Sequence, residues 1–216
     1  MTSILIKIIP LDLASTLSPG ILALAIILLG SKNYPKARTL AMLCGTLLVA
    51  VILAILGFVI GNNVTPGTDP TVRSAIIDMV FGLVFVYYGI KIILSKERKI
   101  EPKEGSGAQF FKWFAIGFII SATNFDAVLL NFAAAKEVGD AAINYFDKII
   151  LLIINSLFFA LPIILPLVAY LIFPKFAGAM LEKLNRVVLK YSRYILFAMF
   201  FLFGLYFLIK GIGFFF

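Results

Sequence analysis

Long apolar runs are the feature that most constrains what this chain can fold into. There are six, each about 20 residues long, which a helix rising about 1.5 Å per residue needs to cross roughly 30 Å of hydrocarbon. Composition agrees, since 62% of residues are hydrophobic, 14% are charged and mean hydropathy is +1.07. The predicted transmembrane helices are Ile8–Gly30, Ala37–Gly61, Val72–Leu94, Phe110–Ala135, Ile149–Phe173 and Tyr194–Gly213.

The apolar runs favour helices over barrel strands. They lack period-two alternation and are about twice as long as a spanning strand. Helices then remain as the way to satisfy backbone hydrogen bonds in lipid. The connections, at residues 31–36, 62–70, 96–107 and 174–190, are rich in charge and helix breakers. The predicted fold class is an all-α integral membrane protein without a soluble domain.

The charged segment 96–109 lies at the middle of the chain and is predicted to be a cytoplasmic linker. It separates residues 1–95 from residues 110–216, with three predicted helices in each half. Because three is odd, the second half enters the membrane from the opposite side to the first. We therefore predict two inverted three-helix repeats, a plan common among secondary transporters.

The basic residues gather on one side of the predicted bundle. Of the 19 lysines and arginines, 14 lie in or beside the first, third and fifth connections, so the positive-inside rule places both termini outside. These residues face anionic lipid and explain the net charge of +8, so we expect membrane lipids, and no nucleic acid, as partners. The abundance of isoleucine, lysine and phenylalanine indicates a prokaryotic source. The 14 residues are Lys32, Lys36, Arg38, Lys91, Lys96, Arg98, Lys99, Lys103, Lys112, Lys175, Lys183, Arg186, Lys190 and Arg193.

Two of the runs, the first and the fourth, are interrupted by polar and helix-breaking residues. Aligning the two halves places Ser18-Pro19 on Asn124-Phe125. Paired interruptions of this kind point to a substrate site between two repeats. The candidate binding residues are Asp12, Ser15, Thr16, Ser18, Pro19 and Gly20 in the first run and Thr123, Asn124 and Asp126 in the fourth.

These candidates differ in what they would contribute. Pro19 leaves a carbonyl near Ser15 without its helical donor. That carbonyl would either bind a substrate or ion, or belong to a plain proline kink. A carboxylate at membrane depth is costly, so Asp126 is expected to face a cavity, a partner or a proton path. Asp12 is expected near the outer interface. Asp78, in the third run, is a further candidate.

Other polar residues inside the runs have two readings. Thr46, Asn131 and Asn155 with Ser156 are either hydrogen-bonding contacts between helices or substrate ligands. The single cysteine, Cys44, is expected to be a small buried residue. The chain has no histidine and no second cysteine, so we expect no metal site and no cofactor. The residues do not assemble a nucleophile, an acid and a metal site, and we expect no enzyme.

Segments along nearly the whole chain resemble one family. Leu13–Gly30 and Ala37–Gly45 are similar to the opening of the GAP or Sap family, the glycopeptidolipid- and sulfolipid-addressing proteins of the LysE transporter superfamily. In the second half, Gly117–Asn124 resembles the family's helix that ends in an Asn-Pro-Lys element. Leu161–Tyr170 resembles its double-proline helix, and Gly204–Gly211 resembles its closing helix.

The resemblance breaks after Asn124, where Phe125 and Asp126 replace the family's proline and lysine. If a lysine there contacts an anionic substrate in relatives, this chain has exchanged a positive charge for a negative one. Asp126 would suit a proton, a cation or a cationic solute.

The resemblance implies a six-helix, LysE-like exporter of the plasma membrane. We expect secondary export of a small or lipid-linked solute through a site between the two interrupted helices. Coupling would be to an ion gradient, because the chain has no Gly-x-x-x-x-Gly-Lys-Ser/Thr loop. The alternatives are a non-transporting partner that docks or assembles a lipid-export complex, and a cation transporter that uses Asp126. A homodimer would close faces that so small a bundle leaves open.

Overall fold

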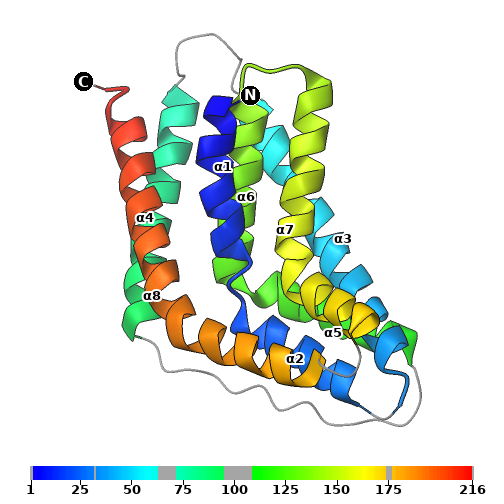
Figure 1. Cartoon of the computed structure of the whole chain (residues 1–216). Coiled ribbons are helices and arrows are strands. Elements are labelled where there is room, and N and C mark those ends of the chain that lie inside the picture. The colour runs from blue at the N-terminus through cyan, green and yellow to red at the C-terminus, as the bar shows by residue number, and fades with distance from the viewer. Residues whose placement is uncertain (1, 32, 63–71, 95–108, 174–176, 216) are drawn as a thin grey trace.

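The computed structural model describes residues 2–31, 33–62, 72–94, 109–173 and 177–215, and this part of the chain is helical without strands (Figure 1). The predicted linker 96–109 lies outside it except for Gln109, as does most of the connection 62–70. The helices are α1 (Thr2–Ser15), α2 (Pro19–Gly30), α3 (Pro35–Asn62), α4 (Val72–Leu94), α5 (Phe110–Thr123), α6 (Phe125–Asp140), α7 (Tyr145–Ile172) and α8 (Ala177–Ile212).

Within the described residues, four helices are long and apolar enough to cross a membrane: α3, α7, the Ala75–Leu94 part of α4 and the Arg193–Ile212 part of α8. Two bent pairs pass the same test together. The chain bends by 56° between α1 and α2, and by 75° between α5 and α6. Counting each bent pair as one span gives up to six. The prediction of an all-helical, multi-pass membrane protein is therefore confirmed, and the predicted apolar runs lie mainly on helix, with breaks inside the first and the fourth.

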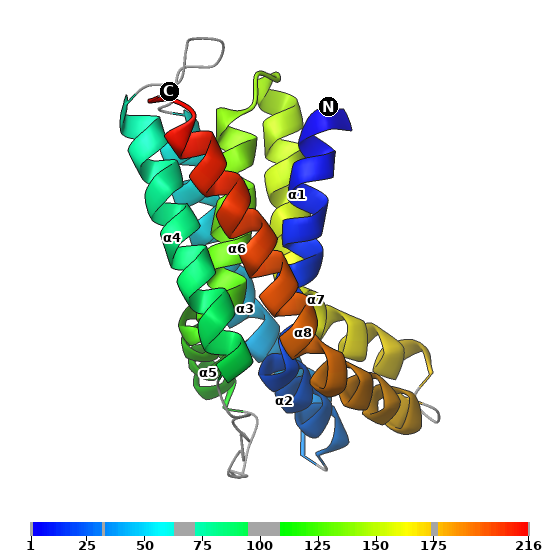
Figure 2. The same cartoon turned by 90° about the vertical axis from the view of Figure 1, so that its left-hand side faces the viewer.

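The two halves contain the same kinds of element in the same order. Each has a bent pair, then a helix of 28 residues, α3 or α7, and then a closing helix, α4 or α8. α4 and α8 lie side by side in both views (Figures 1 and 2). The start of α1 and the end of α8 lie at the same end of the bundle, which we call the terminal end. The turn between α2 and α3 lies at the opposite end.

Two predictions about local structure are wrong. Much of the segment 174–190, predicted as a loop, is helix, because α8 begins at Ala177 and continues for 36 residues. The physical reason is that no glycine or proline follows Gly178 until Gly204, and helix-forming residues fill the interval. Cys44, predicted to be buried, is exposed, since it lies on the outward face of α3.

Glycines set the distances between neighbouring helices. A Cβ at Gly204 in α8 would lie 3.0 Å from the backbone nitrogen of Val86 and 3.1 Å from the carbonyl oxygen of Gly82, both in α4. A Cβ at Gly117 in α5 would clash with the backbone of Met42 in α3. Such close backbone approach is how membrane helices gain packing energy where lipid removes the hydrophobic drive to associate.

Candidate functional site

The breaks in the two bent pairs meet in space. Ser18 precedes Pro19, the first residue of α2, and Asn124 precedes Phe125, the first residue of α6. Asn124 Nδ2 donates a hydrogen bond of 2.8 Å to Ser18 Oγ. The residues that the sequence alignment paired therefore hold matching positions before the two half-helices and contact each other. We call Ser18, Asn124 and the first turns of α2 and α6 the break junction.

Neither of the two bridging side chains caps its own helix. Ser18 and Asn124 make no capping hydrogen bond, because each is engaged with the other. The first-turn N–H groups of α2 and α6, at the positive ends of the helix dipoles, thus receive no acceptor from the preceding side chain. The first turn of α2 holds no acidic residue, whereas that of α6 holds Asp126. The break junction presents backbone donors and one carboxylate.

Three of the predicted hydroxyl ligands, unlike Ser18, bond to their own helices. Ser15 Oγ donates to Asp12 O at 2.7 Å and Thr16 Oγ1 donates to Leu13 O at 2.7 Å. Thr123 Oγ1 donates to Ile119 O at 2.7 Å. These bonds satisfy carbonyls at the ends of α1 and α5, where the helical donors run out. Gly20 is the second residue of α2 and is half-buried.

Asp12 lies inside the bundle and not at the interface, so that expectation is wrong. Its side chain is buried in the last turn of α1, facing α7, where Asn155 Nδ2 donates 2.6 Å to Asp12 Oδ1. Asn155 Nδ2 also lies 3.3 Å from Asn131 O, and Asn131 Nδ2 donates 3.1 Å to Asn155 O. We call Asp12, Asn131 and Asn155 the amide–carboxylate cluster. It joins α1, α6 and α7.

Asp126 occupies a different environment from Asp12. It is half-buried in the first turn of α6 and interacts electrostatically with Lys91 of α4. Thr46 Oγ1 and Ser121 Oγ lie 2.7 Å apart and join α3 to α5, which is the helix-contact reading of Thr46. The candidates therefore divide between the break junction, the amide–carboxylate cluster and a third group around Asp78.

Asp78 belongs to a set of ion pairs near the terminal end that the sequence reasoning missed. Lys136 Nζ lies 2.6 Å from Asp78 Oδ1, and both side chains are almost fully buried. Lys210 Nζ lies 3.3 Å from Asp78 Oδ2, 3.2 Å from Glu137 Oε1 and 3.2 Å from Asp140 Oδ2. Lys7 Nζ lies 3.4 Å from Glu137 Oε2. This terminal ion-pair network comprises Lys7, Asp78, Lys136, Glu137, Asp140 and Lys210.

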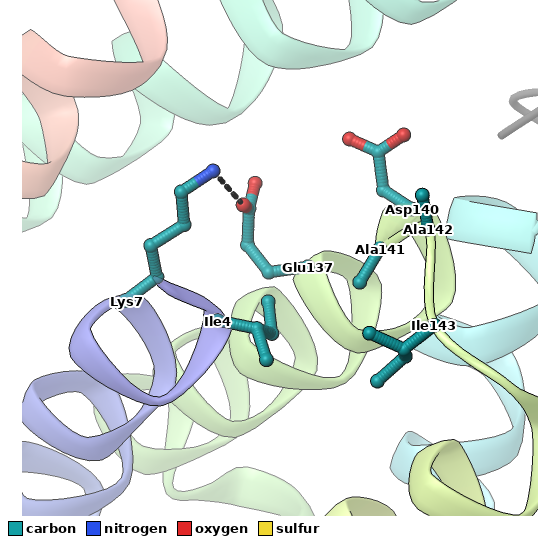
Figure 3. Close-up of a pocket in the computed structure, with 7 residues that line it drawn as sticks. All are labelled: Ile4, Lys7, Glu137, Asp140, Ala141, Ala142 and Ile143. Atoms are coloured by element: carbon teal, nitrogen blue, oxygen red, sulfur yellow. Dashed lines mark hydrogen bonds and ion pairs between the residues drawn. The ribbon is translucent and has the colours of Figure 1, made fainter. Parts of the chain in front are cut away.

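A pocket of about 370 Å³ adjoins this network. Figure 3 shows the Lys7 and Glu137 side chains pointing toward each other and joined by an ion pair, with Asp140 also among the residues that line the pocket. Ile4 and residues 141–143 supply its apolar lining. The helical spacing of Glu137 and Asp140 could have indicated the network, but the fourth predicted helix ended at Ala135 and left these residues and Lys136 outside it.

Residues 8–213 match the family described as Sap, sulfolipid-1-addressing protein. The match begins within α1, at Ile8, and covers α2 to α8 completely. No curated protein and no solved structure matches the chain.

Proposed function

The chain belongs to the Sap, sulfolipid-1-addressing protein, family, and we propose that it is a secondary transporter that exports a small or lipid-linked solute. The solute would bind at the break junction, and an ion gradient would drive its export. The expected location is the plasma membrane of a prokaryote, with both termini outside.

The observation that carries the proposal is the contact between the two helix breaks. Ser18 and Asn124 lie 106 residues apart in the sequence, yet their side chains share one hydrogen bond. A membrane helix is costly to interrupt, because every freed backbone group needs a partner in a medium without water. Two interruptions that converge are characteristic of transporters, whose half-helix termini bind polar parts of a substrate.

The groups at the break junction suit a polar head group better than a hydrocarbon chain. The uncapped N–H groups of α2 are donors at the positive end of a dipole, and Asp126 adds a negative charge on the α6 side. The sulfolipid in the family's description supports a lipid-linked solute, whose polar head would meet these groups.

The terminal ion-pair network suits a gate. It ties α1, α4, α6 and α8 at one end of the bundle. The Lys7 side chain is 44% exposed, and exposed ion pairs are weak enough to exchange partners. In an alternating-access cycle, loss of the contact between Lys7 and Glu137 would open the adjoining pocket toward the break junction.

The test is ion flux through purified protein in liposomes made from lipids of the source cell, which supply lipid-linked solutes. Proton and sodium flux would be followed under imposed gradients for wild type, Ser18→Ala and Asn124→Ala. Ser31→Ala is the matched control, since Ser31 Oγ bonds within the far end of α2. We expect at least about tenfold slower flux for the two junction variants and unchanged flux for the control. A tenfold loss corresponds to an activation free energy that is higher by about 1.4 kcal/mol.

The alternative is a membrane protein that docks a lipid-export complex and carries nothing itself. A folded wild-type protein without flux under any imposed gradient would favour that role and refute the proposal. Asp126→Asn, measured in the same liposomes, tests the cation-transport alternative. If the only flux found is of a cation and that flux disappears in this variant, the cation is the substrate.

A further inference from the structure

Three buried oxygen atoms of the amide–carboxylate cluster have no hydrogen-bond partner within the described residues. They are Asp12 Oδ2, Asn131 Oδ1 and Asn155 Oδ1, one from each of α1, α6 and α7. All three side chains have zero solvent exposure. All three atoms are acceptors, so the cluster lacks a hydrogen-bond donor or a cation to pair with them.

The amide orientations do not remove this shortage. Turning the Asn155 amide would set its oxygen against Asp12 Oδ1 and Asn131 O, both of which accept hydrogen bonds. Turning the Asn131 amide would set its oxygen against Asn155 O in the same way. Both Nδ2 atoms are therefore fixed as donors, and both Oδ1 atoms remain unpaired in the core of the bundle.

We propose that Asp12, Asn131 and Asn155 form a binding site for a dehydrated monovalent cation of the sodium type, which couples transport to the ion gradient. One carboxylate and two amide carbonyls are hard oxygen ligands carrying a single negative charge, which one monovalent cation neutralises. A divalent ion would leave a net positive charge in an apolar bundle. A proton on Asp12 would supply only one donor, which cannot serve both amide oxygens.

The backbone around Asp12 favours a cation as well. Asp12 lies in the last turn of α1, where the carbonyl end of the helix dipole is negative. This negative helix end repels an unpaired carboxylate, whereas a cation is attracted by both the carboxylate and the helix end. Half-helix carboxyl ends of this kind hold coupling ions in transporters with broken helices.

The position of the site gives it a role in coupling. α1 ends at one break and α6 begins at the other, and the cation would hold these two half-helices together through Asp12 and Asn131. Ion binding would thereby fix the geometry of the break junction where the solute binds. This role rests on the proposed transport function, but the site itself is tested without transport.

The experiment measures equilibrium binding of radiolabelled sodium to the purified full chain in detergent, with N-methylglucamine holding the ionic strength constant. Asp12→Asn removes the charge, Asn131→Leu removes one amide oxygen at similar volume, and Asp147→Asn is the matched control at the start of α7. We expect saturable binding of about one sodium ion per chain. We also expect at least about tenfold weaker binding in the first two variants and unchanged binding in the control.

Absence of saturable sodium binding to folded wild-type protein would overturn the proposal, as would sodium binding of wild-type strength in folded Asp12→Asn. If Asp12→Asn does not fold, Asn131→Leu decides in its place. Sodium binding without flux in liposomes would leave this site standing and refute transport. Flux without sodium binding would do the reverse.

Discussion

Replacing Lys136 by methionine removes the buried cation of the terminal ion-pair network. Lys136 Nζ lies 2.6 Å from Asp78 Oδ1, and its side chain has no solvent exposure. Breaking a buried pair costs about 3–5 kcal/mol, because the remaining charge stays buried without its partner. Lys210 remains 3.3 Å from Asp78 Oδ2. We therefore expect the lower end of that range, about 3 kcal/mol.

The double variant Lys136→Met with Asp78→Asn separates this cause from loss of packing. The network holds three lysines and three carboxylates, so losing Lys136 alone leaves one carboxylate in excess, whereas the double change restores equality. Replacing both partners of a buried pair is often close to neutral. We expect the free energy of unfolding of the double variant to lie within about 1 kcal/mol of the wild-type value, because neither partner is left as an unpaired buried charge.

The assay is unfolding in mixed micelles by titration with sodium dodecyl sulfate, followed by far-ultraviolet circular dichroism. Lys183→Met is the matched control, because Lys183 is exposed. The reasoning is refuted if Lys136→Met unfolds at the same midpoint as this control. It is also refuted if the double variant is as unstable as the single one, since the loss would then come from packing.

Three further variants test separate contacts. Gly204→Val should cost about 1–3 kcal/mol in the same unfolding assay, because its Cβ would press on the α4 backbone; Gly30→Val, whose Cβ meets nothing within 4 Å, should cost less, and equal losses would contradict the packing argument. Asn124→Ala, which removes the hydrogen bond to Ser18, should cost only about 1 kcal/mol, and a loss several times larger would show that Asn124 has a structural role beyond this bond. Lys7→Met should change stability by less than about 1 kcal/mol, since its ion pair is partly exposed, and a larger loss would argue against a weak gate.

The sequence by itself determined the class of fold and where the chain is interrupted. Apolar runs and helix breakers act through each residue's own transfer free energy and backbone freedom, so they can be read locally. The all-helical architecture follows from them, and the family was indicated by the resemblance of segments such as Leu13–Gly30; both are confirmed. The alignment of Ser18 with Asn124 also came from local signals, because both breaks precede a new half-helix.

Local signals failed where the surroundings of a charge mattered. Sequence reasoning singled out Asp126, expected Asp12 near the outer interface and ended the fourth predicted helix at Ala135, before Lys136. In the fold, Asp12 and Lys136 are buried, and Asp126 is only half-buried. Residue type alone carries no record of which way a helix turns in the bundle, and burial depends on that rotation.

Only the tertiary structure decided which polar groups meet. Asp12 and Asn155 are separated by 143 residues, and Lys136 and Asp78 by 58. Their contacts depend on the rotation and spacing of helices, which glycines such as Gly204 set through close packing between distant segments. The same packing buries three acceptor oxygens without a partner, one on each of three helices. The proposed ion site is therefore a property of helix arrangement, which no stretch of sequence contains.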